Sequence, residues 1–248
     1  MHVSITPEIV FQWGGMPITN TLITAVATSL VLIAIGYFAV RKLKKVPKAL
    51  SVQNIFEMVI EALLNMIDGV TGDRKLSYKF FPLVATIFIF ILLSNWLGLL
   101  PGMGSIGFFE TAGENHHQTF SPIFRSAASD LNVTLALAIV SVLATQIFGI
   151  AILGFLKYGK KFINFSSPIK LFVGLLEIIS EIAKMVSFSF RLFGNIFAGE
   201  VLLVVIMTLV PFIAPIPFFA LEIFVGFIQA LVFAMLTLVF LKTAATVH

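Results

Sequence analysis

Residues 185–210 read MVSFSFRLFGNIFAGEVLLVVIMTLV, a stretch that is long and apolar enough to cross a lipid bilayer. Within it lies Arg191, whose guanidinium stays protonated under essentially all conditions. A charge at membrane depth costs from about 3 to more than 10 kcal/mol, so ionisable residues there usually mark ion pathways. Arg191, with Glu200 farther along the same predicted helix, therefore points to ion translocation.

The composition is typical of an integral membrane protein. Of the 248 residues, 59% are hydrophobic and 11% are charged, against about 25% charged residues in a typical soluble domain. The net charge of +4 does not indicate nucleic-acid binding, because the cations cluster at the ends of hydrophobic runs. The absence of cysteine excludes disulfides and thiolate metal sites. We expect an all-α protein embedded in lipid, without a cofactor or a metal.

Five segments reach the roughly 20 apolar residues that a span requires. They are Ile18–Val40, Phe80–Leu100, Leu131–Leu156, Met185–Val210 and Phe218–Leu241. Cations follow the first span at residues 41–45 and the third at 157–161, and Lys242 follows the fifth. The segment between spans two and three has Arg125 as its only cation. The positive-inside rule then predicts an outer N-terminus and a cytoplasmic C-terminus, by default in a bacterial plasma (inner) membrane.

The first eighteen residues carry no lysine or arginine, so the first hydrophobic run is expected to be a retained span rather than a signal peptide. The whole chain, residues 1–248, is predicted to be one membrane domain. Its expected parts are an outer N-terminal segment (1–17), a first span with a surface helix (18–78), spans two and three with an outer loop at 101–130 (79–165), and an ion-conducting helical hairpin (166–248).

Two further segments are predicted to be helical without spanning. Ser51–Val70 begins at a plausible serine N-cap and is amphipathic, which is typical of a helix on a membrane surface. The second runs from Pro168 into the fourth span. Along it, polar side chains recur every three or four positions and therefore share one face; they are Glu177, Glu181, Lys184, Ser187, Arg191 and Asn195.

Spans four and five carry the strongest site candidates. Glu200 lies nine positions after Arg191 and so faces the opposite way, about 180° around the helix. If the two spans fold back on each other near Pro211, Glu200 comes level with Glu222, and Arg191 comes level with Gln229. This register predicts an acidic pair nearer the outside and an Arg/Gln pair nearer the middle of the membrane.

Plainer interpretations of these residues remain open. Arg191 could snorkel to the interface, Glu200 could be protonated and structural, and Glu222 could be interfacial. Asn195 and Gln229 could simply join helices by hydrogen bonds. Asp130 is predicted first as the N-cap of span three, and second as part of an outer channel mouth with Asn132 and Asn95. His116-His117 is expected to be solvated rather than metal-bound, because no third ligand is evident.

Several blocks resemble the a subunit of F-type ATP synthases. The first is Arg191-Leu-Phe-Gly-Asn195-Ile-Phe-Ala-Gly-Glu200. The others are Ser94-Asn95-Trp-Leu-Gly-Leu-Leu-Pro101, Asp130-Leu-Asn132-Val-Thr-Leu-Ala-Leu-Ala and Ile228-Gln229-Ala-Leu-Val-Phe-Ala-Met-Leu-Thr. The matching blocks run from about residue 50 to the C-terminus in the family's order.

The resemblance implies a non-catalytic, proton-translocating stator whose last two helices lie tilted against a rotor ring of c subunits. It places Arg191 opposite the ring with Gln229 beside it. Glu200 and Glu222 match the outer half-channel, although many relatives have a histidine at one of these two positions. The inner route is matched by Asn195, Ser187 and Glu177. The implied partners are the c-subunit ring, the b subunits of the peripheral stalk and the remaining ATP synthase subunits.

Two other functions stay open from the residues alone. A stand-alone ion-coupled secondary transporter could use Arg191 with Glu200 and Glu222 as its ion site, but such folds usually contain internal repeats, and none is evident here. An assembly scaffold could use the same polar groups to hold helices together. Copurification with a small helical-hairpin proteolipid separates a stator from both.

Overall fold

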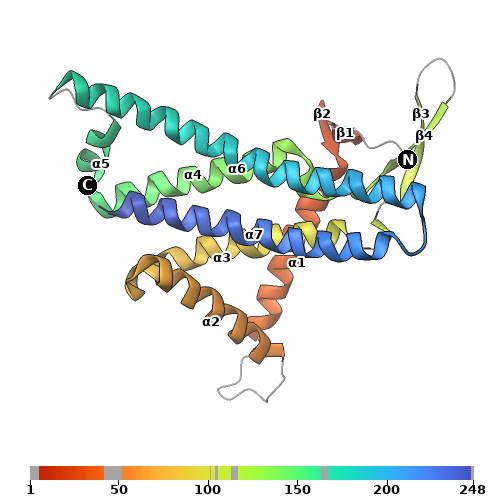
Figure 1. Ribbon diagram of the computed structural model, residues 1–248, viewed down its shortest axis with the longest axis horizontal. Helices are drawn as coiled ribbons and strands as arrows, with labels where there is room; N and C mark the ends of the chain where they lie inside the picture. The colour runs from red at the N-terminus through yellow and green to blue at the C-terminus, as the bar shows by residue number, and fades with distance from the viewer. Residues whose placement is uncertain are drawn as a thin grey trace. The chain divides into compact units, whose positions relative to one another are not determined.

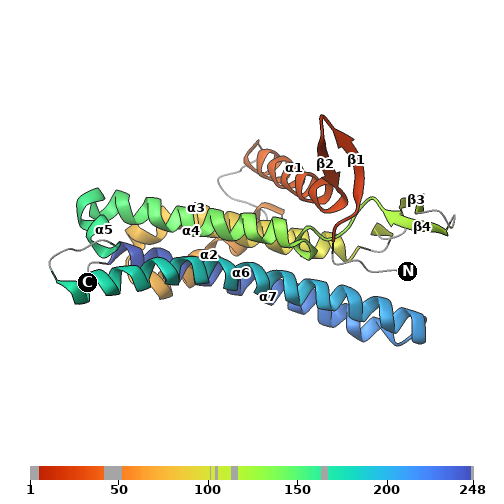
Figure 2. The same ribbon diagram turned by 90° about the horizontal axis from the view of Figure 1, so that it is seen from above.

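The computed structural model describes residues 6–41, 52–100, 102–103, 106–112, 117–162 and 167–246. They form long helices and two small β-hairpins (Figures 1 and 2). Within these ranges, five helices are long and apolar enough to cross a membrane. The prediction of an all-α membrane protein with five spans is therefore confirmed. Ser51, Lys42–Lys45 and His116, on which parts of the prediction depend, lie outside the described residues.

The helices in chain order are α1 (Asn20–Arg41), α2 (Val52–Thr71), α3 (Arg74–Gly98), α4 (Leu131–Leu153), α5 (Phe155–Phe162), α6 (Pro168–Leu209) and α7 (Pro215–Ala245), with a short 3-10 turn, η2 (Ala127–Ser129), before α4. The amphipathic segment and the fourth span were expected to run together from Pro168, and α6 is indeed one continuous helix. Span three ends three residues earlier than expected, at Leu153. The reason is Gly154, whose φ of 82° is the left-handed conformation that ends helices.

Two β-hairpins were missed by the sequence analysis. Strands β1 (Ile9–Trp13) and β2 (Met16–Thr19) pair in antiparallel fashion. Gly14 and Gly15 connect them with φ values of 58° and 86°, which a two-residue hairpin turn requires. The Gly-Gly pair between two apolar runs was the available signal. Strands β3 (Gly107–Ala112) and β4 (His117–Pro122) form the second hairpin, inside the predicted outer loop.

The chain divides into two compact units, which we describe separately. Unit 1 comprises Met1–Arg41, Ile89–Thr134 and Phe190–Leu231, and unit 2 comprises Lys42–Phe88, Leu135–Ser189 and Val232–His248. Helices α3, α4, α6 and α7 contribute residues to both units.

In unit 1, α1 presents a row of buried threonines to the segment that precedes α4. Thr21, Thr24 and Thr28 recur every three or four residues and are at most 1% exposed. The Thr21 hydroxyl donates a hydrogen bond to Asp130, and the Thr24 hydroxyl oxygen accepts one from the backbone N–H of Arg125. These contacts satisfy polar groups that would otherwise be costly to bury, and they fix the approach to α4.

In unit 2, aromatic rings and a few polar contacts join the helices. The ring of Phe188 on α6 packs against those of Phe233 and Phe240 on α7, with centroid distances of 5.0 and 5.4 Å. Ser141 of α4 and Thr237 of α7 share a hydrogen bond of 2.7 Å. The Lys242 ammonium of α7 donates to the carbonyl oxygen of Val70, in α2, at 2.7 Å. The last contact satisfies a carbonyl in the final turn of α2, where no helical partner exists.

Tyr158 ties α5 to its neighbours in the same unit. Its side chain is 4% exposed and donates a hydrogen bond of 2.6 Å to Oε1 of Gln146 in α4. Burial, with smaller contributions from Glu181 and Glu177, raises the pKa of the Tyr158 phenol from its ordinary 10.0 to about 12. The folded chain therefore holds this proton at pH values where the unfolded chain has lost it.

The sign of the resulting pH dependence follows from this difference. Between pH 10 and about 12 the folded state binds more protons than the unfolded state, so the free energy of unfolding falls as pH rises through that window. We expect this fall in the purified wild-type chain and not in Tyr158→Phe, measured by denaturant unfolding in detergent. Tyr78→Phe, which removes the hydroxyl of an exposed ring, is the control and should keep the fall. Identical profiles for wild type and Tyr158→Phe would contradict the assignment.

Candidate functional site

The centre of the site in unit 1 is an ion pair that the sequence analysis did not predict. Nε of Arg125 lies 2.9 Å from Oε1 and 3.1 Å from Oε2 of Glu200, and Nη2 lies 3.1 Å from Oε2. The guanidinium thus binds both carboxylate oxygens of Glu200, in the fork geometry that makes such pairs strong. The side chain of Arg125 is 6% exposed and that of Glu200 is 29% exposed. A charged pair of this kind is mostly removed from water.

Arg125 is held from several directions within unit 1. Its backbone N–H lies 3.3 Å from Oγ1 of Thr24 in α1, and its guanidinium lies 5.9 Å from the ring centroid of Phe197 in α6. The next residue, Ser126, packs so closely on Gly98 of α3 that a Cβ there would lie 2.5 Å from the Cβ of Ser126. The segment carrying Arg125 is therefore anchored to α1, α3 and α6.

Glu222 of α7 packs against Gly199 of α6, the residue that precedes Glu200. Its carboxylate occupies the space that a side chain on Gly199 would need, so α6 and α7 approach closely at this point. Glu222 is 6% exposed, and within the described part of the chain no hydrogen bond or ion pair joins it to another residue. The contact with Gly199 agrees with the expected register, in which Glu222 comes level with Glu200.

Helix α3 fixes α7 beside Glu222 by two side-chain hydrogen bonds to backbone carbonyls. Nδ2 of Asn95 donates to the carbonyl oxygen of Gly226 at 3.0 Å, and Nε1 of Trp96 donates to that of Ile223 at 3.1 Å. Asn95 is 2% exposed, and its Oδ1 is buried without a hydrogen-bond partner among the described residues. Asn95 therefore joins helices, and its expected place at an outer mouth remains a prediction.

Asp130 is the N-cap of α4, as its first interpretation predicted. Oδ1 accepts the backbone N–H of Asn132 at 2.8 Å, which satisfies one of the unpaired donors of the first turn. Oδ2 accepts the hydroxyl of Thr21 at 2.7 Å, and Asp130 is 3% exposed. Asn132 is exposed at the start of α4. A role for Asp130 and Asn132 at the mouth of a pathway is not tested by these contacts.

Arg191 and Asn195 lie exposed on the side of α6 away from Glu200. Arg191 makes no hydrogen bond or ion pair with any described residue. Phe190, the residue before it, is 55% exposed, and Ser187 and Asn195, one turn away on either side, are exposed on the same face. This cation thus lies on the polar stripe of a helix that is apolar enough to span a membrane, and the expectation that Arg191 and Glu200 face opposite ways is confirmed. The half-buried Gln229 forms no hydrogen bond with Arg191.

The remaining candidates, Ser187 and Glu177, belong to unit 2. Ser187 is exposed on α6. Glu177 forms an ion pair of 2.8 Å with Lys161 of α5, where both side chains are about one-third exposed (29% and 33%). Glu177 thus has a cationic partner, which the sequence analysis did not foresee.

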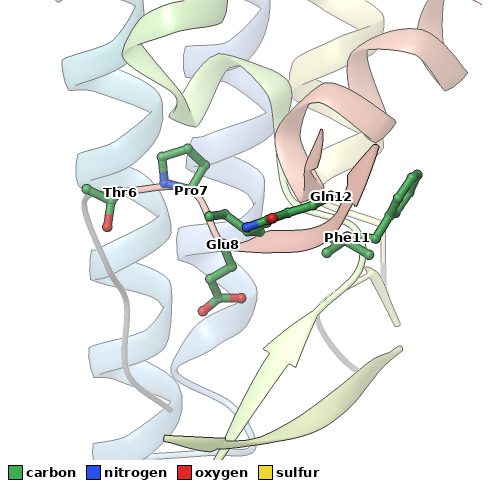
Figure 3. Close-up of a pocket in the computed structure, with 7 residues that line it drawn as sticks. Thr6, Pro7, Glu8, Phe11 and Gln12 are labelled. Atoms are coloured by element: carbon green, nitrogen blue, oxygen red, sulfur yellow. The ribbon is translucent and has the colours of Figure 1, made fainter. Parts of the chain in front are cut away.

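A pocket of about 560 Å³ lies elsewhere in unit 1, along residues 6–12 (Figure 3). It is lined by the segment that leads into β1 and by β1 itself, including Glu8 and Gln12, and by none of the candidate site residues. The described residues contain no group of three or more side chains suited to hold a metal ion.

Arg125 is the functional candidate that the sequence analysis missed. It had been noted only as the lone cation of the outer segment. A lone cation next to a span that contains an unexplained carboxylate is a signal for an ion pair, but the sequence gives no distance between positions 125 and 200.

The amino-acid sequence is similar to those of known membrane proteins. The family described as "ATP synthase A chain" matches residues 21–242. The chain is 37% identical to ATP synthase subunit a of Campylobacter jejuni subsp. jejuni serotype O:23/36 (strain 81-176) over 223 residues, covering 89% of this chain and 87% of that protein. It is 32% identical to ATP synthase subunit a of Moorella thermoacetica over 244 residues, covering 98% of this chain and 99% of that protein.

Replacing Gly199 by alanine tests the contact with Glu222. The added methyl group would overlap the Glu222 carboxylate, and such overpacking costs about 1–3 kcal/mol of stability. We expect this loss in the unfolding free energy of the purified chain in detergent. Gly36→Ala, whose Cβ would meet nothing within 4 Å, is the matched control. In a Glu222→Ala background the Gly199→Ala step should cost under about 0.5 kcal/mol; an undiminished cost there would show that the two residues are not in contact.

Proposed function

The chain belongs to the ATP synthase A chain family, and on that premise we propose that it is the stator in which Arg191 separates two proton half-channels that lead to a ring of c subunits. It is a multi-pass integral membrane protein and a subunit of an ATP synthase. It would carry out no bond chemistry itself. Its task would be to convert proton flow across the membrane into rotation of the ring.

The observation that carries the proposal is the exposed Arg191, which has no partner among the described residues and lies in a helix apolar enough to span a membrane. No described residue of the chain neutralises this charge, although a bare cation in lipid is costly. A partner that brings a carboxylate to this face would supply the missing counter-charge. A rotor carboxylate has the complementary problem, because it can be ionised in the membrane only opposite a cation or in a wet channel. Arg191 and an ionised ring carboxylate would therefore neutralise each other and lower the cost of holding each charge in the membrane.

The two half-channels would lie on either side of this barrier. Glu200 and Glu222, with Asp130, Asn132 and Asn95 toward the mouth, would belong to the outer one. Asn195, Ser187 and Glu177 would belong to the inner one, with Gln229 near the arginine. Since Arg191 repels a proton that tries to pass directly, each proton must board the ring and ride with it before it leaves.

The energetics fit a rotary machine that uses several protons for each ATP. One elementary charge crossing 100 mV releases about 2.3 kcal/mol, which is too little for ATP synthesis by a single proton. The c-subunit ring, the b subunits of the peripheral stalk and the remaining subunits of the synthase would be the partners. The chain would lie in a bacterial plasma membrane, with its N-terminus outside and its C-terminus in the cytoplasm.

The test is proton flux in liposomes that contain the whole complex. Arg191→Ala should lower ATP-driven pumping and ATP synthesis by at least about tenfold, equivalent to roughly 1.4 kcal/mol, while the complex still assembles. Arg74→Ala, which removes an arginine whose side chain is 47% exposed and pairs with Asp68, is the control and should pump normally. Increased passive proton leak in Arg191→Ala would support its role as the barrier. Unchanged coupled flux in Arg191→Ala would refute the proposal, because the residue would then only snorkel.

A further inference from the structure

The ion pair of Arg125 with Glu200 divides the two outer carboxylates into different chemical types. Glu200 has both oxygens bound by a guanidinium whose side chain is 6% exposed. Glu222 is 6% exposed and has no hydrogen bond or ion pair with any described residue. The sequence offers no way to distinguish the two carboxylates, but in the structure Glu200 has a cationic partner and Glu222 has none among the described residues.

The difference bears on which of them can exchange protons. Arginine cannot lose its proton in a protein, so a proton added to Glu200 would leave the Arg125 charge buried and uncompensated, which is the costly outcome when a buried pair is broken. Among the described residues, the charged group in contact with Glu200 is Arg125, from the segment before η2, and the Glu222 carboxylate rests on the adjacent Gly199. Of these two, Arg125 has the sign opposite to Glu200.

Arg125 also cannot easily swing away to release Glu200. Its backbone N–H is bound to Thr24, its neighbour Ser126 is wedged against Gly98, and Asp130 farther along the same segment is bound to Thr21. With the backbone fixed and the side chain only 6% exposed, the guanidinium could leave Glu200 only by finding another rotamer among closely packed neighbours.

We propose that Arg125 is a positioning residue that keeps Glu200 ionised throughout the cycle, so that Glu222 is the outer carboxylate that carries protons. The inference rests on the proposed stator function. In each cycle Glu222 takes a proton from water of the outer path and gives it to a rotor carboxylate, while the proton count of Glu200 does not change. The pair serves to hold α6, next to Gly199, in the position that presents Glu222 to the path.

The experiment compares four variants of the whole complex in liposomes, by ATP-driven pumping and passive proton flux. Arg125→Gln leaves the partly buried Glu200 without its partner, Glu200→Gln leaves the buried Arg125 without its own, and each variant should reduce coupled flux at least about tenfold. The double variant Arg125→Gln/Glu200→Gln should recover most of that loss, because no unpaired charge remains. Glu222→Gln should abolish coupled flux, and no second substitution at position 125 should restore it. Arg74→Gln/Asp68→Asn, which neutralises a more exposed pair, is the control and should pump normally.

A double variant that assembles but stays as inactive as Glu200→Gln would overturn the inference, because Glu200 would then carry protons itself. A second measurement needs no variant. Carbodiimides react with protonated carboxyls, so treatment of the wild-type complex with dicyclohexylcarbodiimide, followed by peptide mass spectrometry, should modify Glu222 and spare Glu200. Equal modification of both residues would also overturn the inference.

Failure of the inference can be told apart from failure of the stator function itself. If Arg191→Ala abolishes coupling while the Arg125/Glu200 double variant is inactive, the stator function stands and only the assignment of the proton carrier is wrong. If Arg191→Ala pumps normally, the stator function fails whatever the double variant does.

Discussion

A charge removed from water needs an opposite charge within contact distance, and this requirement organises unit 1. Arg125 and Glu200 meet it inside the chain, with two carboxylate oxygens bound to one guanidinium. Arg191 does not meet it within the described residues. The same helix thus carries one charge that is neutralised internally and one that is left for a partner. That contrast between Glu200 and Arg191, on opposite sides of α6, is the physical basis for the proposal that this helix faces a rotor.

Small residues allow the polar groups to reach one another. Gly199 gives the Glu222 carboxylate its place against α6, and Gly226 lets Asn95 approach the backbone of α7. Close backbone approach at small residues, supported by side-chain hydrogen bonds, is how helices associate in membranes, where apolar burial drives little. The positions of Glu200 and Glu222 therefore depend on glycines as much as on the acidic residues themselves. A glycine that looks unremarkable in the sequence becomes part of the site.

The polar contacts of α1 have a comparable supporting role. Thr21 and Thr24 are buried polar residues of a predominantly apolar span, and each bonds to the segment that leads into α4. They hold Asp130 as a helix cap and Arg125 as a partner for Glu200. Residues 125–130, between two spans, are buried and held in this way by contacts with α1. This segment can then carry a buried arginine, which a mobile loop could not hold in place.

Local composition and periodicity were enough to predict the membrane class, the five spans, the continuity of α6 from Pro168 and the cap at Asp130. The sequence also determined that Arg191 and Glu200 face apart, since helix geometry fixes the angle between two positions on one helix. It did not reveal the β1–β2 hairpin, although Gly14 and Gly15 were a local signal that was overlooked. Only the tertiary structure decided that Arg125 neutralises Glu200 and that Glu222 rests on Gly199. Residues 125 and 200 are separated by 75 positions, and nothing in the periodicity of either segment records which side chains meet once the helices pack.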